Sequence, residues 1–434
     1  MPLIEGDSAT IPKDFATLSA TTTISLTLLS FGGHLARSTL PVLEVFFLED
    51  GFVTSSGYGL LLAAQSFPAL ILPFFIGYLY DTFDYRHVTV CLLVTALMGQ
   101  VLFALAVTVK SLPWAIAAQL IFGSGVSGVM VAQRALISEN LKGREGLGTG
   151  CTVAVASIAK LIGKASMAPI VIWLRSYKLA LFCFCLYSLF SLVAGLVAMY
   201  STKYSISAHV ALPLSDPDEE PAPKRSLCDS LSLMSSRFYC VVFTHMTYLL
   251  VFHLLGNFLP HILTVSWNQG IVVAGFIASL SSLFPMLIAP VVGYTVDRFG
   301  FRIEICILAG VATTVAYALF LFSSVVPVLP ILLISVAQSL IPTITLAMVP
   351  LCIPSVVFGI GFGIVEFVDH LGNLVGNFGF GYLYQATSSY KLGMILLFLL
   401  SILGLLLLSI LTVIDRNSDF RRKESFRYLY DEVL

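Results

Sequence analysis

"GYLYDTFDYR", residues 77–86, recurs as "GYTVDRFGFR", residues 293–302. Gly, Tyr, Asp, Phe and Arg coincide at five of the ten positions. Each copy follows the second long apolar segment of its half of the chain. Because the two copies occupy equivalent places, the repeat predicts an internal duplication in which one set of helices is built twice.

The rest of the chain is strongly apolar. Of its 434 residues, 58% are hydrophobic and 11% are charged, whereas soluble proteins carry about 25% charged residues. Apolar runs of about 20 residues recur, and each can cross a hydrocarbon core about 30 Å thick. We therefore predict an all-α membrane protein, embedded in the lipid bilayer, with twelve transmembrane helices over about residues 20–47, 57–80, 87–109, 114–136, 147–171, 179–200, 238–265, 270–295, 303–324, 328–350, 355–384 and 391–414.

One long polar interval, rich in Pro, Ser and charged residues, separates the sixth span from the seventh. It predicts a linker between two six-helix bundles. The acidic start of the chain does not have the pattern of a cleavable signal peptide. The expected organisation is a cytosolic N-terminal tail (1–19), an N-terminal six-helix bundle (20–200), a cytosolic linker (201–237), a C-terminal six-helix bundle (238–414) and a cytosolic C-terminal tail (415–434).

Lys and Arg residues indicate the orientation. With both tails and the linker in the cytosol, 15 Lys and Arg residues lie on the cytosolic side. The exceptions on the opposite, lumenal side are Lys110, Arg175, Lys178 and Lys391. This asymmetry satisfies the positive-inside rule.

The repeated decapeptide resembles the loop motif of the major facilitator superfamily, a Gly-x-x-x-Asp-Arg-x-Gly-Arg-Arg-like pattern. The resemblance implies two six-helix bundles that transport a solute by alternating access. The Gly lets helices approach closely, and the Asp can cap the next helix or pair with the Arg. The first copy departs from the pattern at Thr82 and Asp84. The predicted gating residues are Gly77, Asp81, Arg86, Gly293, Asp297, Arg298 and Arg302.

Two further segments, "VAQRALISENLKGREGLG" (131–148) and "FGIGFGIVEFVDHLGNLVGNFGFGYL" (358–383), resemble the lysosomal dipeptide transporters of that superfamily. This resemblance implies uniport of dipeptides out of the lysosomal lumen, a lysosomal or endosomal membrane rather than the plasma membrane, and a glycosylated accessory subunit as partner. The chain departs from the family where Gln119 and Ser127 replace an Arg and an acidic residue of the fourth helix. Substrate and coupling therefore stay open.

Ionisable groups inside a membrane are costly unless they face a protein interior or a wet cavity, so they mark functional sites. The N-terminal half holds intramembrane cations, whereas the deep carboxylates Glu366 and Asp369 lie in the C-terminal half. Residues 366, 369 or 370, 373 and 377 are three or four positions apart, which predicts a single inward polar stripe on that helix. Similar spacing predicts polar stripes at His34, Arg37 and Glu44 of the first span and at His245, His253, Asn257 and His261 of the seventh. A zwitterion such as a dipeptide carries a negative charge for the cations and a positive charge for the carboxylates. The alternative interpretation is that these groups pair with each other and hold the two bundles together without a ligand. The substrate-binding candidates are His34, Arg37, Arg134, Lys160, Lys164, His253, Asn257, Glu366, Asp369, His370 and Asn373.

Several functions are not indicated. The sequence has no nucleophile elbow, phosphate loop or metal-ligand spacing, so neither an enzyme, a cofactor nor a metal is expected. The near-zero net charge of −1 gives no sign of a nucleic-acid partner. The alternatives left are transport of organic anions or other small solutes, proton coupling through Glu366, Asp369 or His370, and a non-transporting membrane sensor.

Overall fold

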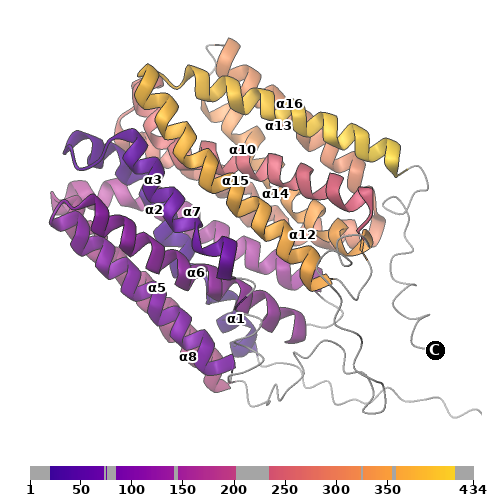
Figure 1. Ribbon diagram of the computed structural model, residues 1–434, viewed down its shortest axis with the longest axis horizontal. Helices are drawn as coiled ribbons and strands as arrows, with labels where there is room; N and C mark the ends of the chain where they lie inside the picture. Colours follow the sequence, from indigo (N-terminus) through magenta and orange to yellow (C-terminus); the bar gives the residue numbers. More distant parts are fainter. Residues whose placement is uncertain are drawn as a thin grey trace, which may run out of the picture.

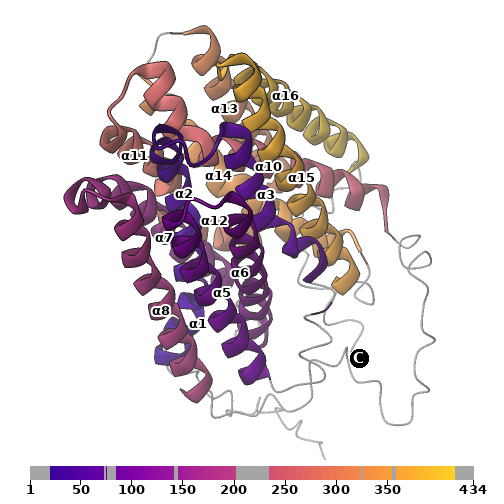
Figure 2. The same cartoon turned by 60° about the vertical axis from the view of Figure 1, so that its left-hand side comes forward.

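The computed structural model describes residues 20–72, 75, 85–140, 145–201, 234–323, 326–353 and 358–415, and all its regular elements are helices (Figure 1). The helices of the first half lie together, and those of the second half lie beside them (Figures 1 and 2). The first half contains α1 (Ala20–Leu28), α2 (Phe31–Glu49), α3 (Ser55–Ser66), α5 (Tyr85–Thr108), α6 (Leu112–Asn140), α7 (Glu145–Leu174) and α8 (Tyr177–Ser201).

The second half begins with the long helix α10 and ends with α16. Its second predicted span is interrupted by a short 3-10 turn, η1, between α11 and α12. The elements are α10 (Ser236–Trp267), α11 (Ile271–Ser279), η1 (Leu280–Ser282), α12 (Leu283–Phe299), α13 (Arg302–Phe322), α14 (Val328–Met348), η2 (Val349–Leu351), α15 (Phe358–Thr387) and α16 (Lys391–Ile414).

These helices are consistent with all twelve predicted spans. Within the described ranges, ten helical segments are long and apolar enough to cross a membrane. The other two predicted spans fall on α1–α2, which is interrupted between Leu28 and Phe31, and on α15, which carries the polar residues of the candidate site. Pro residues inside α2, α7, α10, α12 and α14 remove backbone donors, which packed transmembrane helices tolerate.

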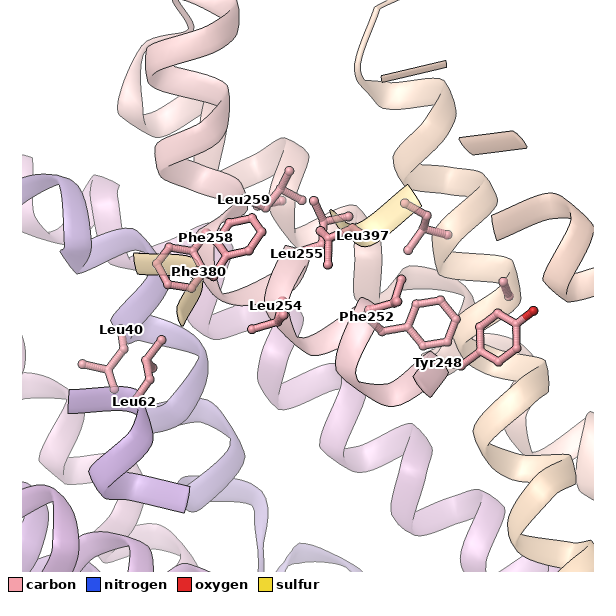
Figure 3. Close-up of a cluster of buried hydrophobic side chains, with 14 of the residues drawn as sticks. Leu40, Leu62, Tyr248, Phe252, Leu254, Leu255, Phe258, Leu259, Phe380 and Leu397 are labelled. Atoms are coloured by element: carbon pink, nitrogen blue, oxygen red, sulfur yellow. The ribbon is translucent and has the colours of Figure 1, made fainter. Parts of the chain in front are cut away.

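The halves meet closely where α3 crosses α15. A methyl group in place of the Gly59 hydrogen would lie 2.5 Å from the carbonyl oxygen of Asn377, and one at Gly381 would collide with the Ser55 carbonyl. Glycine therefore allows backbone contact at this crossing. Aromatic side chains fill the space beside it, with the rings of Tyr58 and Phe258 edge to face at 5.4 Å (Figure 3 shows Phe258).

The predicted lumenal end of the first half is held by polar contacts outside the spans. The Asp50 carboxylate, just after α2, lies 2.9 Å from Lys110 Nζ and accepts a hydrogen bond from the Tyr177 hydroxyl. The Tyr177 hydroxyl, and after it Lys110, holds the pKa of Asp50 below its usual range. These contacts join the ends of α2, α5 and α8.

The gating motif is described in part. Gly77 and Asp81 lie outside the described residues, as do the side chains of Asp297 and Arg298. Arg86 begins the first turn of α5, Gly293 lies in α12, and Arg302, 4% exposed, begins α13. Gly300 joins α12 to α13 with a φ of +77°, a conformation that favours glycine. The turn explains the glycine of the second copy, and the Asp–Arg pairing stays a prediction.

Candidate functional site

The cationic side of the candidate site is built by α2 and α7. Lys160 and Lys164 lie one turn apart on α7, and each lies within electrostatic range of a neighbour, Lys160 of Arg37 and Lys164 of Lys160. Gly163 lets α7 pack directly against α2, because a methyl group there would collide with the Ser38 hydroxyl. The helices therefore hold like charges together.

Arg37 and Lys164 also contact elements other than α2 and α7. The Arg37 Nη1 atom lies 4.0 Å from the Met130 sulfur, and its Nε and Nη2 atoms have no hydrogen-bond partner within the described part of the chain. Lys164 Nζ donates to the Ser281 hydroxyl over 3.2 Å, across the boundary between the halves. A buried guanidinium with free donors is suited to a carboxylate.

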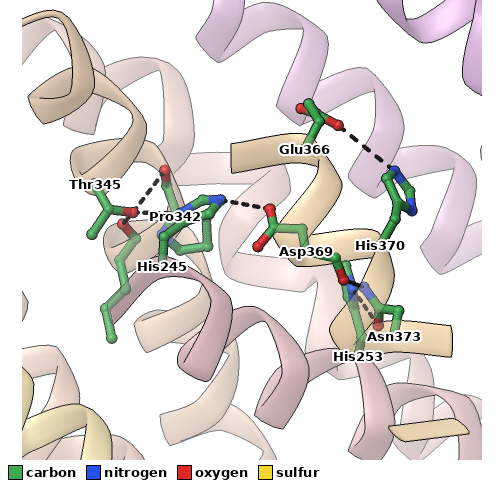
Figure 4. Close-up of polar contacts among 9 residues, drawn as sticks. His245, His253, Pro342, Thr345, Glu366, Asp369, His370 and Asn373 are labelled. Atoms are coloured by element: carbon green, nitrogen blue, oxygen red, sulfur yellow. Dashed lines mark hydrogen bonds and ion pairs between the residues drawn. The ribbon is translucent and has the colours of Figure 1, made fainter. Parts of the chain in front are cut away.

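The C-terminal side of the site is built by α15 and α10. On one face of α15, Asp369 points to His245 of α10, with 3.0 Å between the carboxylate Oδ2 and Nε2 (Figure 4). The other ring nitrogen of His245 lies 2.7 Å from the Thr345 hydroxyl of α14. Asp369 and His245 are 8% and 2% exposed. This cluster ties three helices of one bundle together.

The next turns of the same face also pack against α10. His253 Nδ1 lies 3.1 Å from the Asn373 Oδ1 atom, and Asn257 Nδ2 donates to Asn377 Oδ1 over 2.9 Å. Asn373 also donates to the backbone carbonyl of Asp369 over 3.0 Å. Because these amides find hydrogen-bond partners within the C-terminal half, we interpret them first as contacts that pack its helices together.

A second face of α15 carries Glu366 and His370. These side chains are one turn apart and half-buried, with 3.6 Å between Glu366 Oε2 and His370 Nε2 (Figure 4). His253 lies within electrostatic range of His370 and of two cations from the other half, Lys160 and Arg37. The ion pair of α15 and the cations of α2 and α7 therefore converge on His253.

The structure thus divides the predicted polar stripe of α15. Residues 366 and 370 share one face, and residues 369, 373 and 377 share another, because each set repeats every four residues. His34 is buried on α2, one turn before Arg37. Arg134 lies in α6, with its side chain outside the described residues. A single inward stripe is too simple, since half of it packs within its own bundle.

One interbundle cluster was not anticipated from the sequence. Glu44 of α2 is completely buried, and its Oε1 atom lies 3.3 Å from Nδ1 of His261 on α10. The Tyr390 hydroxyl lies 2.6 Å from the same nitrogen. Nearby, the Tyr58 hydroxyl donates to the Asn257 carbonyl over 3.0 Å. Glu44 and His261 stand on the noted polar stripes of their helices, but Tyr390 precedes a helix and carries no such signal.

Comparisons with known proteins agree with this architecture. Residues 18–256 and 241–427 match the family model described as Major Facilitator Superfamily. The chain is 24% identical over 370 residues to the lysosomal dipeptide transporter MFSD1 of Danio rerio, covering 80% of this chain and 77% of that protein. With the protein of the same name from Homo sapiens it is 24% identical over 428 residues, covering 93% and 89%.

Two solved structures share the fold. The crystal structure of the human organic anion transporter MFSD10 (TETRAN) has a TM-score of 0.64 and 16% identity, and the match covers 92% of this chain and 100% of that chain. The crystal structure of the nucleoside transporter NupG has a TM-score of 0.68 and 14% identity, and the match covers 90% and 99%. At these identities the likeness concerns the fold alone.

Proposed function

The chain belongs to the Major Facilitator Superfamily, and on this premise we propose that it carries small zwitterions, most specifically dipeptides, out of the lysosomal lumen by alternating access. It is a multi-pass membrane transporter of that superfamily. The observation that carries the substrate class is that charged groups of both halves converge on His253. Arg37, Lys160 and Lys164 lie on one side, and the Glu366–His370 pair lies on the other.

A zwitterion suits this arrangement because it has a charge for each side. Its carboxylate would bind Arg37 and Lys160, and its ammonium would bind Glu366. At about 4 Å and an effective dielectric constant near 20, one such charge pair is worth about 4 kcal/mol before desolvation costs. A ligand that bridges the halves would also draw them together, as alternating access requires.

The named relatives support the same substrate class and the same membrane. They are called lysosomal dipeptide transporters, and they align with most of this chain. We therefore take the lysosomal membrane as the location and uniport as the mode. A glycosylated accessory subunit is part of the same prediction, as are cytosolic termini. Asp369, Asn373 and Asn257 are assigned to holding the helices of the C-terminal half.

Uptake of a labelled dipeptide into liposomes that contain the full chain tests the site. Lys160→Ala and Glu366→Gln should each reduce uptake about tenfold or more, because each removes a charge-assisted hydrogen bond worth about 1.5–3 kcal/mol. Lys110→Ala is the matched control, since Lys110 pairs with Asp50 at the predicted lumenal end. Wild-type uptake by both site variants, at equal protein content, would contradict the assignment.

One observation favours a second candidate. Among the described residues, three cations of the N-terminal half contrast with one carboxylate, Glu366, on the second face of α15. An organic anion would use this surplus without needing Glu366. In the same liposomes, uptake of a monocarboxylate that survives Glu366→Gln would favour that class. Thermal stabilisation by a ligand without any flux would instead favour a membrane sensor.

A further inference from the structure

Glu44 and His261 form the acid–base pair that joins the two halves on the predicted lumenal side. Both belong to long membrane helices, and neither is used by the proposed substrate site. The Tyr390 hydroxyl contacts both, at 2.6 Å from His261 Nδ1 and 3.5 Å from Glu44 Oε1. The ring of Tyr384 stacks on that of Tyr390 at 4.2 Å and also meets the imidazole edge to face. The pair is therefore enclosed by aromatic rings.

Charge balance determines how many protons this enclosed pair holds. Without a proton, Glu44 would be a buried carboxylate beside a neutral imidazole, and its Oε2 atom has no hydrogen-bond partner in the described part of the chain. With two protons, His261 would be a buried cation beside a neutral acid. Both states leave an uncompensated charge in the membrane interior, which is strongly unfavourable. The closed pair therefore holds one proton.

The surrounding groups do not supply or replace this proton. The described titratable side chains that face Glu44 from other helices are, besides His261, phenols, and free Tyr titrates only near about pH 10. Of the lysines of α7, Lys160 lies within electrostatic range of Arg37, and Lys164 lies within electrostatic range of Lys160. The phenols are Tyr58 of α3, Tyr384 of α15 and Tyr390 before α16. Lys164 of α7 instead donates to Ser281, and Tyr177 of α8 donates to Asp50.

Opening on the lumenal side would let water reach both members of the pair. In water, His holds a proton below about pH 6.5 and Glu below about pH 4.3. Near pH 5 the open pair already holds the one proton that the closed pair needs. Above about pH 6.5 it must take a proton up to close, so closure becomes about tenfold less favourable for each further pH unit.

We propose that Glu44 and His261 are a proton-binding gate, which closes the lumenal side when the pair holds one proton. The inference rests on the proposed transport by alternating access. The proton enters from the lumen on closing and returns to it on opening, so none crosses the membrane and the cycle remains a uniport. An acidic lumen favours the closing step, whereas a neutral compartment slows the cycle.

The position of the gate can be measured without any substrate. Ser56 N donates to Gln385 Oε1 over 3.1 Å, so these residues of α3 and α15 mark the closed side. Spin labels at Ser56→Cys and Gln385→Cys, in the full chain without its native cysteines, report the distance between them. From about pH 5 to about pH 8, the long-distance population of the otherwise wild-type protein should rise several-fold.

Variants of the Glu44–His261 pair should change how the closed population depends on pH. Glu44→Gln leaves His261 without its counter-ion, so closure needs a neutral imidazole and the closed population should rise with pH. The double variant Glu44→Gln/His261→Gln should show no pH dependence, and it serves if the single variant does not fold. Tyr58→Phe, which removes a neutral contact between the halves, should keep the wild-type response.

Two results would overturn the gate: a distance distribution of the wild-type pair that does not change with pH, or a Glu44→Gln response with the wild-type sign. If instead the proposed substrate is wrong, dipeptide flux would be absent while the label distances still changed with pH.

Discussion

At the scale of single residues, the two deep carboxylates of α15 have different surroundings. Asp369 is 8% exposed, pairs with His245 and lies within one bundle. Glu366 is 20% exposed at its side chain and pairs at 3.6 Å with His370, which lies within electrostatic range of His253. Burial with a partner from a neighbouring helix indicates structure, whereas partial exposure beside opposite charges indicates a ligand.

Asp369→Asn tests this division. The change keeps the shape of the side chain but removes the charge that His245 faces at 3.0 Å. We expect a loss of about 1–3 kcal/mol in stability, because a buried hydrogen-bonded charge loses its partner. Thermal unfolding in detergent measures it, with Glu366→Gln as the control that should unfold close to the wild-type temperature. Equal unfolding temperatures for Asp369→Asn and wild type would assign Asp369 to the ligand instead.

The sequence predicted which ionisable residues lie inside the membrane helices, but it did not predict their partners. Charges inside apolar runs are visible from composition, so Arg37, Lys160 and Glu366 could be found. The partner of Asp369 could not, because His245 lies far away in the chain and the pairing depends on how α10 and α15 are rotated. Helical spacing gives the faces of one helix but not the neighbour that each face meets.

At the scale of elements, the crossing of α3 and α15 brings the halves into backbone contact. Gly59 leaves no room for a side chain, since a methyl group would lie 2.5 Å from the Asn377 carbonyl oxygen. That oxygen belongs to a helix backbone and cannot move by itself. The crossing therefore requires glycine in the closed arrangement.

Gly59→Ala should force α3 and α15 apart. Overpacking of this kind costs about 1–3 kcal/mol, so we expect a lower unfolding temperature and a smaller closed population between labels at positions 56 and 385. Gly379→Ala on α15 is the matched control, because a methyl group there meets no atom within 4 Å in the described structure. Identical behaviour of the two variants would show that the crossing does not limit closure.

Most elements were predictable for a physical reason. A segment that crosses a membrane must be apolar over about 20 residues, which marks the helices regardless of their neighbours. The described helices are consistent with the predicted spans, and the repeated decapeptide predicted the fold that the family match confirms. The interruptions between α1 and α2 and at η1 were missed, since each is only a few residues long and apolar segments lie on both sides of it.

At the scale of the whole molecule, the two helical halves contact each other near the end that is predicted to face the lumen. The family match covers both halves. The closing contacts, Glu44 with His261 and Gly59 with Asn377, join the halves near the ends of α2 and α15 that are predicted to face the lumen. A ligand that bridges both charged faces would link substrate binding to movement of the halves.

The most direct test of this account compares an unmodified dipeptide with its N-acetyl and C-amide derivatives. Flux of each into liposomes is measured with and without a pH gradient. We predict saturable flux of the unmodified dipeptide without any requirement for a gradient. The flux of each derivative should be lower by a factor of about ten or more, because each derivative lacks one charge. Equal flux of the N-acetyl derivative, or no flux of any dipeptide, would contradict recognition of a zwitterion by both halves.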